Sequence, residues 1–203
     1  MVGAMTDPVA APVPARFHLT QKISPMQNVY RVHADVAGEP GPLIAFAKQK
    51  RLAFKEQFTL FRDETATEPV LTITADRRLD VRSAMTVREP SGAVLGTLRK
   101  RGAASLLRST WELEQPGLPL VVVEERSVPV ALLRRLWDLV PVAGNVPVPW
   151  VFHFDGRTPT GDVVLTHTRL WGVRDRYVLE VTPPYDQRLA IALAICLDAL
   201  QSR

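Results

Sequence analysis

The chain has 203 residues, a length that favours one large or two small domains. It has one cysteine, so no intramolecular disulfide can form. Hydrophobic residues make up 46% of the sequence, enough for one sizeable core. The net charge of +4 permits an anionic partner such as phospholipid or nucleic acid. Solvated basic faces are common, so the charge alone does not demand such a partner.

The N-terminal residues lack both the basic region and the apolar run of a secretory signal. Prolines among alanines and valines predict a flexible tail over residues 1–16, followed by a single domain over residues 17–203. No segment is apolar for long enough to cross a membrane. We therefore expect a cytoplasmic protein, either free or peripheral at a membrane.

Most of the chain after the tail consists of short runs with strand character, separated by turn signals. The clearest run, 81–88, alternates along its length and is followed by the turn Glu89-Pro90-Ser91-Gly92 and a returning strand. The expected strands are 17–23, 28–33, 43–49, 54–62, 70–75, 81–88, 93–100, 108–114, 118–125, 150–155, 162–170 and 176–181. This spacing predicts a sandwich or a barrel.

The C-terminal segment is apolar on every side. Residues Leu189–Leu197 carry no polar face, which is typical of a helix buried in a core, and Asp198 ends the run well short of a membrane span. A barrel of about twelve strands has a lumen too wide for side chains alone to fill. We therefore predict a mainly β fold, a closed antiparallel barrel around this helix, with Cys196 packed as a small hydrophobe.

A second, short amphipathic helix is predicted near 127–140. Ser127 can cap it, Pro129 lies in its first turn, and leucines at 132, 133, 136 and 139 form a stripe. A proline-rich segment, 141–149, follows it. This helix is interpreted as a lid on one barrel mouth, or as the docking surface of a protein-interaction module.

Two stretches together resemble the tubby C-terminal-like barrel superfamily, in the branch of phospholipid scramblases and plant LURP-one-related proteins. Residues 85–100 are similar to a hairpin of that family that ends in basic residues, and residues 186–198 are similar to its central helix. The resemblance spans roughly 24–200 and implies a closed barrel of about twelve strands around a hydrophobic helix. Tubby proteins bind phosphoinositides, and scramblases are linked to calcium-dependent lipid movement.

The chain departs from the scramblase pattern in two respects. It has no cysteine cluster for palmitoylation and no Asp-rich calcium loop, which argues against calcium-dependent scrambling. No histidine pair has metal-ligand spacing, although His153 and His167 lie on neighbouring expected strands and could approach each other. No nucleophile elbow, phosphate loop or dinucleotide fingerprint is present. We expect no catalytic residues, no metal and no cofactor.

Basic clusters at strand ends are the remaining functional signal. The candidate ligand-binding rim consists of Lys48, Lys50, Arg51, Arg99, Lys100 and Arg101. If the strands follow one another around the barrel in chain order, both corners lie at the same mouth. The rim predicts binding of anionic phospholipid or another anionic ligand, whereas the absence of interleaved aromatic residues disfavours nucleic acid. The alternatives are that these residues only protect edges and solubility, or that an unidentified protein docks at 127–140.

Overall fold

The computed structural model describes residues 12–23, 27–50, 57–75, 84–101, 109–126, 153–172 and 175–201. The predicted helix near 127–140, with its proline-rich exit, and Arg51 lie outside these residues. Twelve strands and one helix are described in chain order: β1 (Ala15–Ile23), β2 (Gln27–Val36), β3 (Glu39–Lys50), β4 (Gln57–Phe61), β5 (Pro69–Ala75), β6 (Ala84–Arg88), β7 (Val94–Arg101), β8 (Thr110–Glu114), β9 (Val121–Glu125), β10 (His153–Arg157), β11 (Val163–Leu170), β12 (Asp175–Val181) and α2 (Gln187–Gln201).

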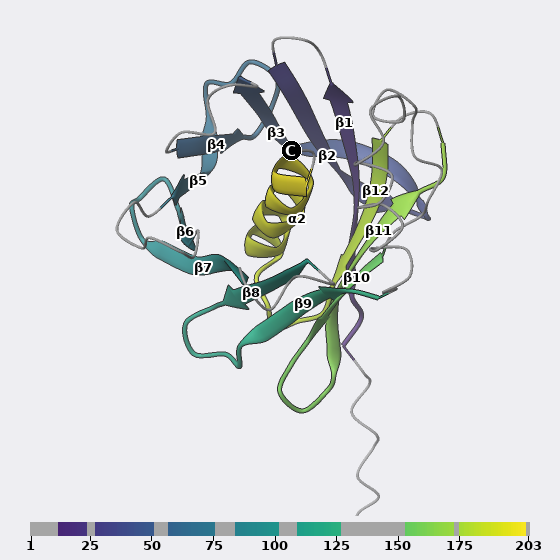
Figure 1. The fold of residues 1–203 in the computed structure, drawn as a ribbon. Helices are drawn as coiled ribbons and strands as arrows, with labels where there is room; N and C mark the ends of the chain where they lie inside the picture. The colour runs from purple at the N-terminus through teal and green to yellow at the C-terminus, as the bar shows by residue number, and fades with distance from the viewer. Residues whose placement is uncertain are drawn as a thin grey trace, which may run out of the picture.

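The strands form a closed antiparallel barrel in which each strand pairs with its neighbours in the sequence. β1 closes the ring by pairing with β12, from Ala15 opposite Val181 to Gln21 opposite Asp175. Figure 1 shows the ring of strands with α2 inside it. This arrangement confirms the predicted fold class, and the strands follow one another around the barrel in chain order.

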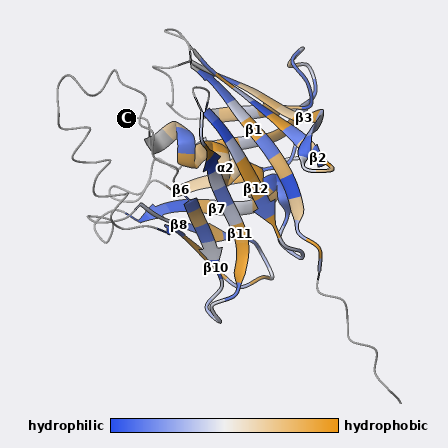
Figure 2. Cartoon of the chain, turned by 90° about the vertical axis from the view of Figure 1, so that its right-hand side faces the viewer, coloured by the Kyte–Doolittle hydropathy of each residue, from blue (hydrophilic) through white to orange (hydrophobic). Residues whose placement is uncertain are grey.

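The helix fills the lumen, as its composition predicts. Every residue from Leu189 to Leu197 is buried, and Ala199 is also buried. The strands present alternate residues to α2, so apolar and polar positions alternate along them in Figure 2. Gly96 of β7 shows how closely the helix passes, because a Cβ at this position would lie 2.6 Å from Leu189 Cδ2.

The two ends of the barrel differ. At the end that we call the hairpin mouth, β2 to β11 are joined in pairs by short turns at 37–38, 62–68, 89–93, 115–120 and 158–162. Glycines with positive φ, such as Gly92 (86°) and Gly161 (94°), allow these tight turns. The opposite end, where the odd-numbered strands finish and the even-numbered strands begin, is called the loop mouth.

Hydrogen bonds fix the direction of α2 between the two mouths. Asp186 caps the first turn by accepting a hydrogen bond from the Arg188 backbone N–H (2.8 Å). Its own N–H donates to Gln115 in the β8–β9 turn (2.8 Å), and Arg188 pairs with Glu89 in the β6–β7 turn (2.8 Å). The helix therefore begins at the hairpin mouth and ends at the loop mouth.

Several strands differ from their predicted bounds, and β3 differs most at its start. β3 begins at Glu39, four residues before its predicted start at 43, and includes the Gly41-Pro42 pair. The turn lies earlier, at Ala37 and Gly38, which have φ of 55° and 88°. Ala-Gly is not a usual pair for two positive φ angles, so the sequence carries a weak signal there. The pairing of β2 with β3 shifts register between Val32 and Asp35, and these shifts accommodate extra residues in β3.

Candidate functional site

Cationic side chains gather at the loop mouth on the outer wall of the barrel. We define the rim cations as Lys22 of β1, Lys48 of β3, Arg99 and Arg101 of β7, Arg126 directly after β9, and Arg176 of β12. All of them lie at strand ends of this mouth, and all but Arg99 are classed as exposed. Acidic side chains predominate at the turns and strand ends of the hairpin mouth, where Asp35, Glu39, Asp63, Glu64, Glu68, Glu89, Glu114 and Asp162 outnumber the exposed Arg16, Arg62, Arg88 and Arg157. The barrel is therefore polarised along its axis.

The predicted β7 cluster is divided between the two faces of the wall. Arg99 and Arg101 point outward and flank Glu112 of β8, at 3.7 and 2.6 Å. Lys100 faces the lumen, where its ammonium lies 5.9 Å from the centre of the buried Trp111 ring. The three consecutive residues thus do not form one surface patch, because neighbouring side chains of a strand point to opposite faces.

The predicted β3 cluster lies at the same mouth but not beside β7. Lys48 is exposed on the outer wall, with its ammonium 5.3 Å from the centre of the Phe46 ring. Lys50 is the last residue of β3, and its side chain is outside the described part of the structure, as is Arg51. β4, β5 and β6 separate the two clusters. At about 4.8 Å per strand, this places them roughly 19 Å apart around the wall.

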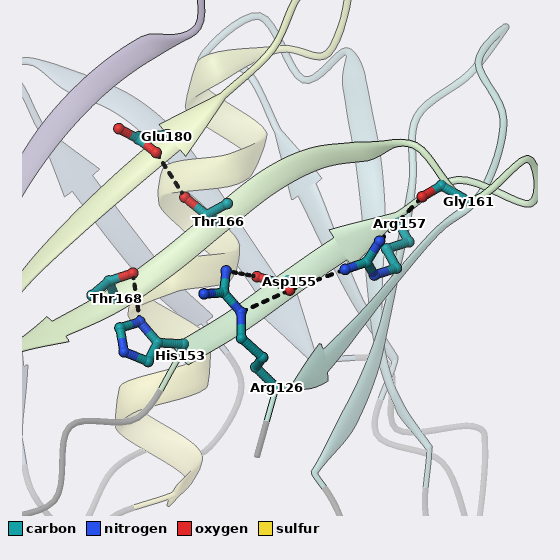
Figure 3. Close-up of polar contacts among 8 residues, drawn as sticks. All are labelled: Arg126, His153, Asp155, Arg157, Gly161, Thr166, Thr168 and Glu180. Carbon is teal, nitrogen blue, oxygen red and sulfur yellow. Dashed lines mark hydrogen bonds and ion pairs between the residues drawn. The ribbon is translucent and has the colours of Figure 1, made fainter.

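A third cationic cluster on the outer wall was not singled out from the sequence (Figure 3). Arg126 donates two hydrogen bonds to the buried Asp155 of β10, at 3.0 and 2.6 Å, and Arg157 approaches the same carboxylate at 3.3 Å. Burial favours a higher pKa for Asp155, but the hydrogen bonds and charge of Arg126 outweigh it and hold the pKa below its ordinary value. Two largely exposed guanidinium groups therefore share one carboxylate, which leaves local positive charge.

The two histidines that could have formed a metal site lie on opposite faces of the wall. β10 and β11 are neighbours, as expected, but His153 is opposite Thr168, and the His153 ring lies 3.0 Å from the Thr168 hydroxyl. His167 faces the lumen, where it stacks on Tyr177 with ring centres 4.9 Å apart. In the described part of the chain, no group of three or more potential His, Cys, Asp or Glu ligands could hold a metal ion.

The lumen becomes polar where α2 reaches the loop mouth. The Asp198 carboxylate of α2 accepts hydrogen bonds from the hydroxyls of Tyr177 (2.5 Å) and Tyr30 (3.0 Å). Gln21 in turn donates to the Tyr30 hydroxyl (3.1 Å). Burial raises the pKa of Asp198 to about 6. The hydrogen bonds from the two tyrosines favour a lower pKa, but their effect is smaller than that of burial. This network joins the end of the helix to β1, β2 and β12.

His167 is the second titratable group in this part of the lumen. Burial lowers its pKa to about 4, so the ring is neutral at physiological pH. Its Nδ1 atom has no hydrogen-bond partner among the described residues. Nearby, Arg169 and Asp175 form an ion pair at 2.6 Å across the β11–β12 hairpin.

The single cysteine is placed for packing. Cys196 is buried in α2, its sulfur lies 3.8 Å from the Met85 sulfur, and burial raises the pKa of the thiol to about 12. A thiol in this environment is a poor nucleophile at neutral pH.

A shallow pocket lies at the hairpin mouth, far from the rim cations. Its volume is about 430 Å³, and its lining includes Leu118, Pro119, Val164, Pro184 and Tyr185. Asp162 is its one ionisable carboxylate, which matches the acidic character of this mouth. None of the described residues that line this pocket is a cation.

The comparison with protein families agrees with the barrel and its central helix. The family model for LURP-one-related (LOR) proteins matches residues 43–198, which run from β3 into the last turns of α2. The chain belongs to the LURP-one-related family. The match begins after β1 and β2, which complete the barrel of this LURP-one-related protein by pairing with β12 and β3. No curated protein matched the chain. Among the described residues, none of the helices has the length and apolar character needed to cross a membrane.

Sequence reasoning missed the residues that depend on pairing across the barrel. Arg126 and Asp155 are 29 positions apart, and β9 and β10 bring them together. Asp198 was read only as the end of an apolar run. One signal was available, because an acid one turn before the end of a fully buried helix requires partners inside the barrel.

Proposed function

We propose that this LURP-one-related domain is a non-enzymatic binding module that docks on anionic lipid through the rim cations of its loop mouth. The observation that carries the proposal is the polarity of the barrel. Exposed cations on β1, β3, β7 and β12 and directly after β9 converge at one mouth, whereas the exposed carboxylates of the described residues lie at the other. A cationic face of this kind is attracted to a negatively charged lipid surface, by about 1 kcal/mol for each Lys or Arg near it.

The geometry of the lumen supports binding at the surface rather than inside. The buried residues of α2 occupy the space in which a lipocalin-like barrel would hold a small apolar ligand. The buried, weakly acidic Cys196 thiol also fits a domain without nucleophilic chemistry. Not every rim cation contributes equally, since Glu112 and Asp155 partly neutralise Arg101 and Arg126.

The proposal is tested by vesicle flotation with two charge-matched variants. The rim variant replaces Lys22, Lys48 and Arg176 with Gln. The control replaces three exposed arginines of the hairpin-mouth half, Arg16, Arg62 and Arg88, with Gln, so the net charge changes equally. We expect the wild type and the control to float with phosphatidylserine-containing vesicles at low salt, and the rim variant to remain unbound. Equal binding by both variants, or no binding by the wild type at low salt, contradicts the proposal.

A further inference from the structure

Trp171 is the most exposed aromatic side chain in the described part of the chain. It follows β11 at the loop mouth and is 73% exposed. The other strongly exposed large hydrophobic residues that are described are valines, and three of these, Val36, Val94 and Val163, lie at the hairpin mouth. Leaving a tryptophan in water forfeits the free energy of burying a large apolar surface. Its position beside the rim cations therefore requires an explanation.

The hairpin that carries Trp171 is held firmly at its base. Arg169 and Asp175 pair at 2.6 Å between its two strands, and Leu170 lies opposite Arg176 in the β11–β12 ladder. Gly172 follows Trp171 with φ of 152°, a backbone conformation that is strained for other residues. The indole thus directly follows a well-paired strand.

Two cations lie at the same end of the next two strands of the barrel, Arg176 on β12 and Lys22 on β1. A Cβ built on Gly172 would lie 3.3 Å from Arg176 Nη2, which places the Arg176 guanidinium beside the residue that follows Trp171. Lys22 lies on the adjacent strand, where its neighbours Thr20 and Gln21 pair with Arg176 and Asp175. Asp175 is already paired with Arg169, so Arg176 and Lys22 leave this end of the strands with excess positive charge.

We infer that Trp171, Arg176 and Lys22 form an anchor for a membrane interface. The indole lies at the headgroup level of an anionic bilayer, while the two cations meet lipid phosphates and carboxylates. Tryptophan is favoured at this depth because its ring is apolar and its N–H can still hydrogen-bond. The inference rests on the proposed function and adds to it the residue that inserts into the bilayer and the depth at which it lies.

The test combines flotation with fluorescence quenching in vesicles of phosphatidylcholine and roughly one third phosphatidylserine. Trp171→Ala should reduce the partition coefficient about tenfold, since part of an aromatic side chain is no longer buried. Trp171→Tyr should retain most of the binding, because tyrosine also favours the interface. Arg176→Gln should reduce binding about fivefold. Val163→Ala, which removes an exposed apolar group at the opposite mouth, should leave binding unchanged.

Brominated lipids report whether the indole enters the bilayer. They should quench the fluorescence of the wild-type protein more than that of Trp171→Ala. If the wild type floats but Trp171→Ala floats equally well and shows equal quenching, the anchor is refuted and the rim proposal stands. If the wild type binds inositol hexakisphosphate but no vesicle, the partner is a soluble anion, and both the anchor and docking on lipid are refuted. If the wild type binds neither, the proposed function fails with it.

Discussion

Asp198 and His167 should have opposite effects on the pH dependence of stability. The pKa of Asp198 is raised from 3.8 to about 6 in the folded state, so the folded protein takes up a proton that the unfolded chain does not hold. Its contribution to stability is present at low pH and is lost as the pH rises through about 6. Moving the pKa by this amount corresponds to about 3 kcal/mol.

His167 acts in the other direction over nearly the same range. Its pKa falls from 6.5 to about 4 on folding, so below pH 6.5 the unfolded chain binds a proton that the folded protein excludes. Stability therefore falls as the pH drops from 6.5 to about 4, again by about 3 kcal/mol. The two groups compensate each other in the wild type. Variants that remove one of them should reveal the other.

The assay is urea unfolding at several pH values between about pH 7 and about pH 4, at constant ionic strength. Relative to the wild type, Asp198→Asn should lose about 2 kcal/mol over this range, whereas His167→Phe should gain about 3 kcal/mol. Asn keeps an acceptor for one tyrosine hydroxyl, and Phe keeps the stack on Tyr177. Any constant offset from altered packing cancels, because the readout is the change with pH. If the free energy of unfolding of each variant changes with pH by the same amount as that of the wild type, the reasoning is refuted.

Three further perturbations address the helix, its contact with the wall and the outer carboxylate. Leu193→Asp should prevent folding, since the Leu193 side chain is fully buried and an unpaired charge there costs several kcal/mol. A cooperative unfolding transition of this variant in circular dichroism would contradict a buried helix. Leu193→Met, which keeps an apolar side chain, is the control. Gly96→Ala should lower the free energy of unfolding in urea by about 2 kcal/mol. The new Cβ would lie 2.5 Å from the Glu114 carbonyl oxygen and 2.6 Å from Leu189 Cδ2. Unchanged stability would show that the helix packs less closely than described. Arg126→Ala should lower the free energy of unfolding by about 1 kcal/mol and raise the pKa of Asp155, which NMR titration can follow. An unchanged pKa would show that Arg157 alone is sufficient to hold the pKa of Asp155 low.

The fold was predictable because its signals are local and repeated. Alternation along runs such as 84–88, with turns such as 89–93 between them, indicates strands regardless of their partners. The apolar run Leu189–Leu197 then indicates what the strands enclose. Chain-order pairing follows from short antiparallel connections, and this correctly placed the ends of β3 and β7 at one mouth.

The candidate site was less predictable because it depends on which way single side chains point and what they meet. Basic runs in the sequence suggested that residues 99–101 act together, yet alternation places Lys100 in the lumen and its neighbours outside. The partners of Asp155 and Asp198 come from distant strands, so no spacing rule marks them. Trp171 carries no sequence signal of exposure, because tryptophan side chains are highly buried on average.

Hydrogen exchange with and without phosphatidylserine vesicles tests most directly that the loop mouth is the ligand-binding face. We expect slower exchange in peptides that cover the loop-mouth ends of β1, β3, β7 and the β11–β12 hairpin, at 20–23, 47–50, 98–101 and 169–177. Peptides over the hairpin-mouth turns at 37–38, 89–93, 115–120 and 158–162 should exchange at the same rate with and without vesicles. Slower exchange confined to the hairpin-mouth turns would contradict the account.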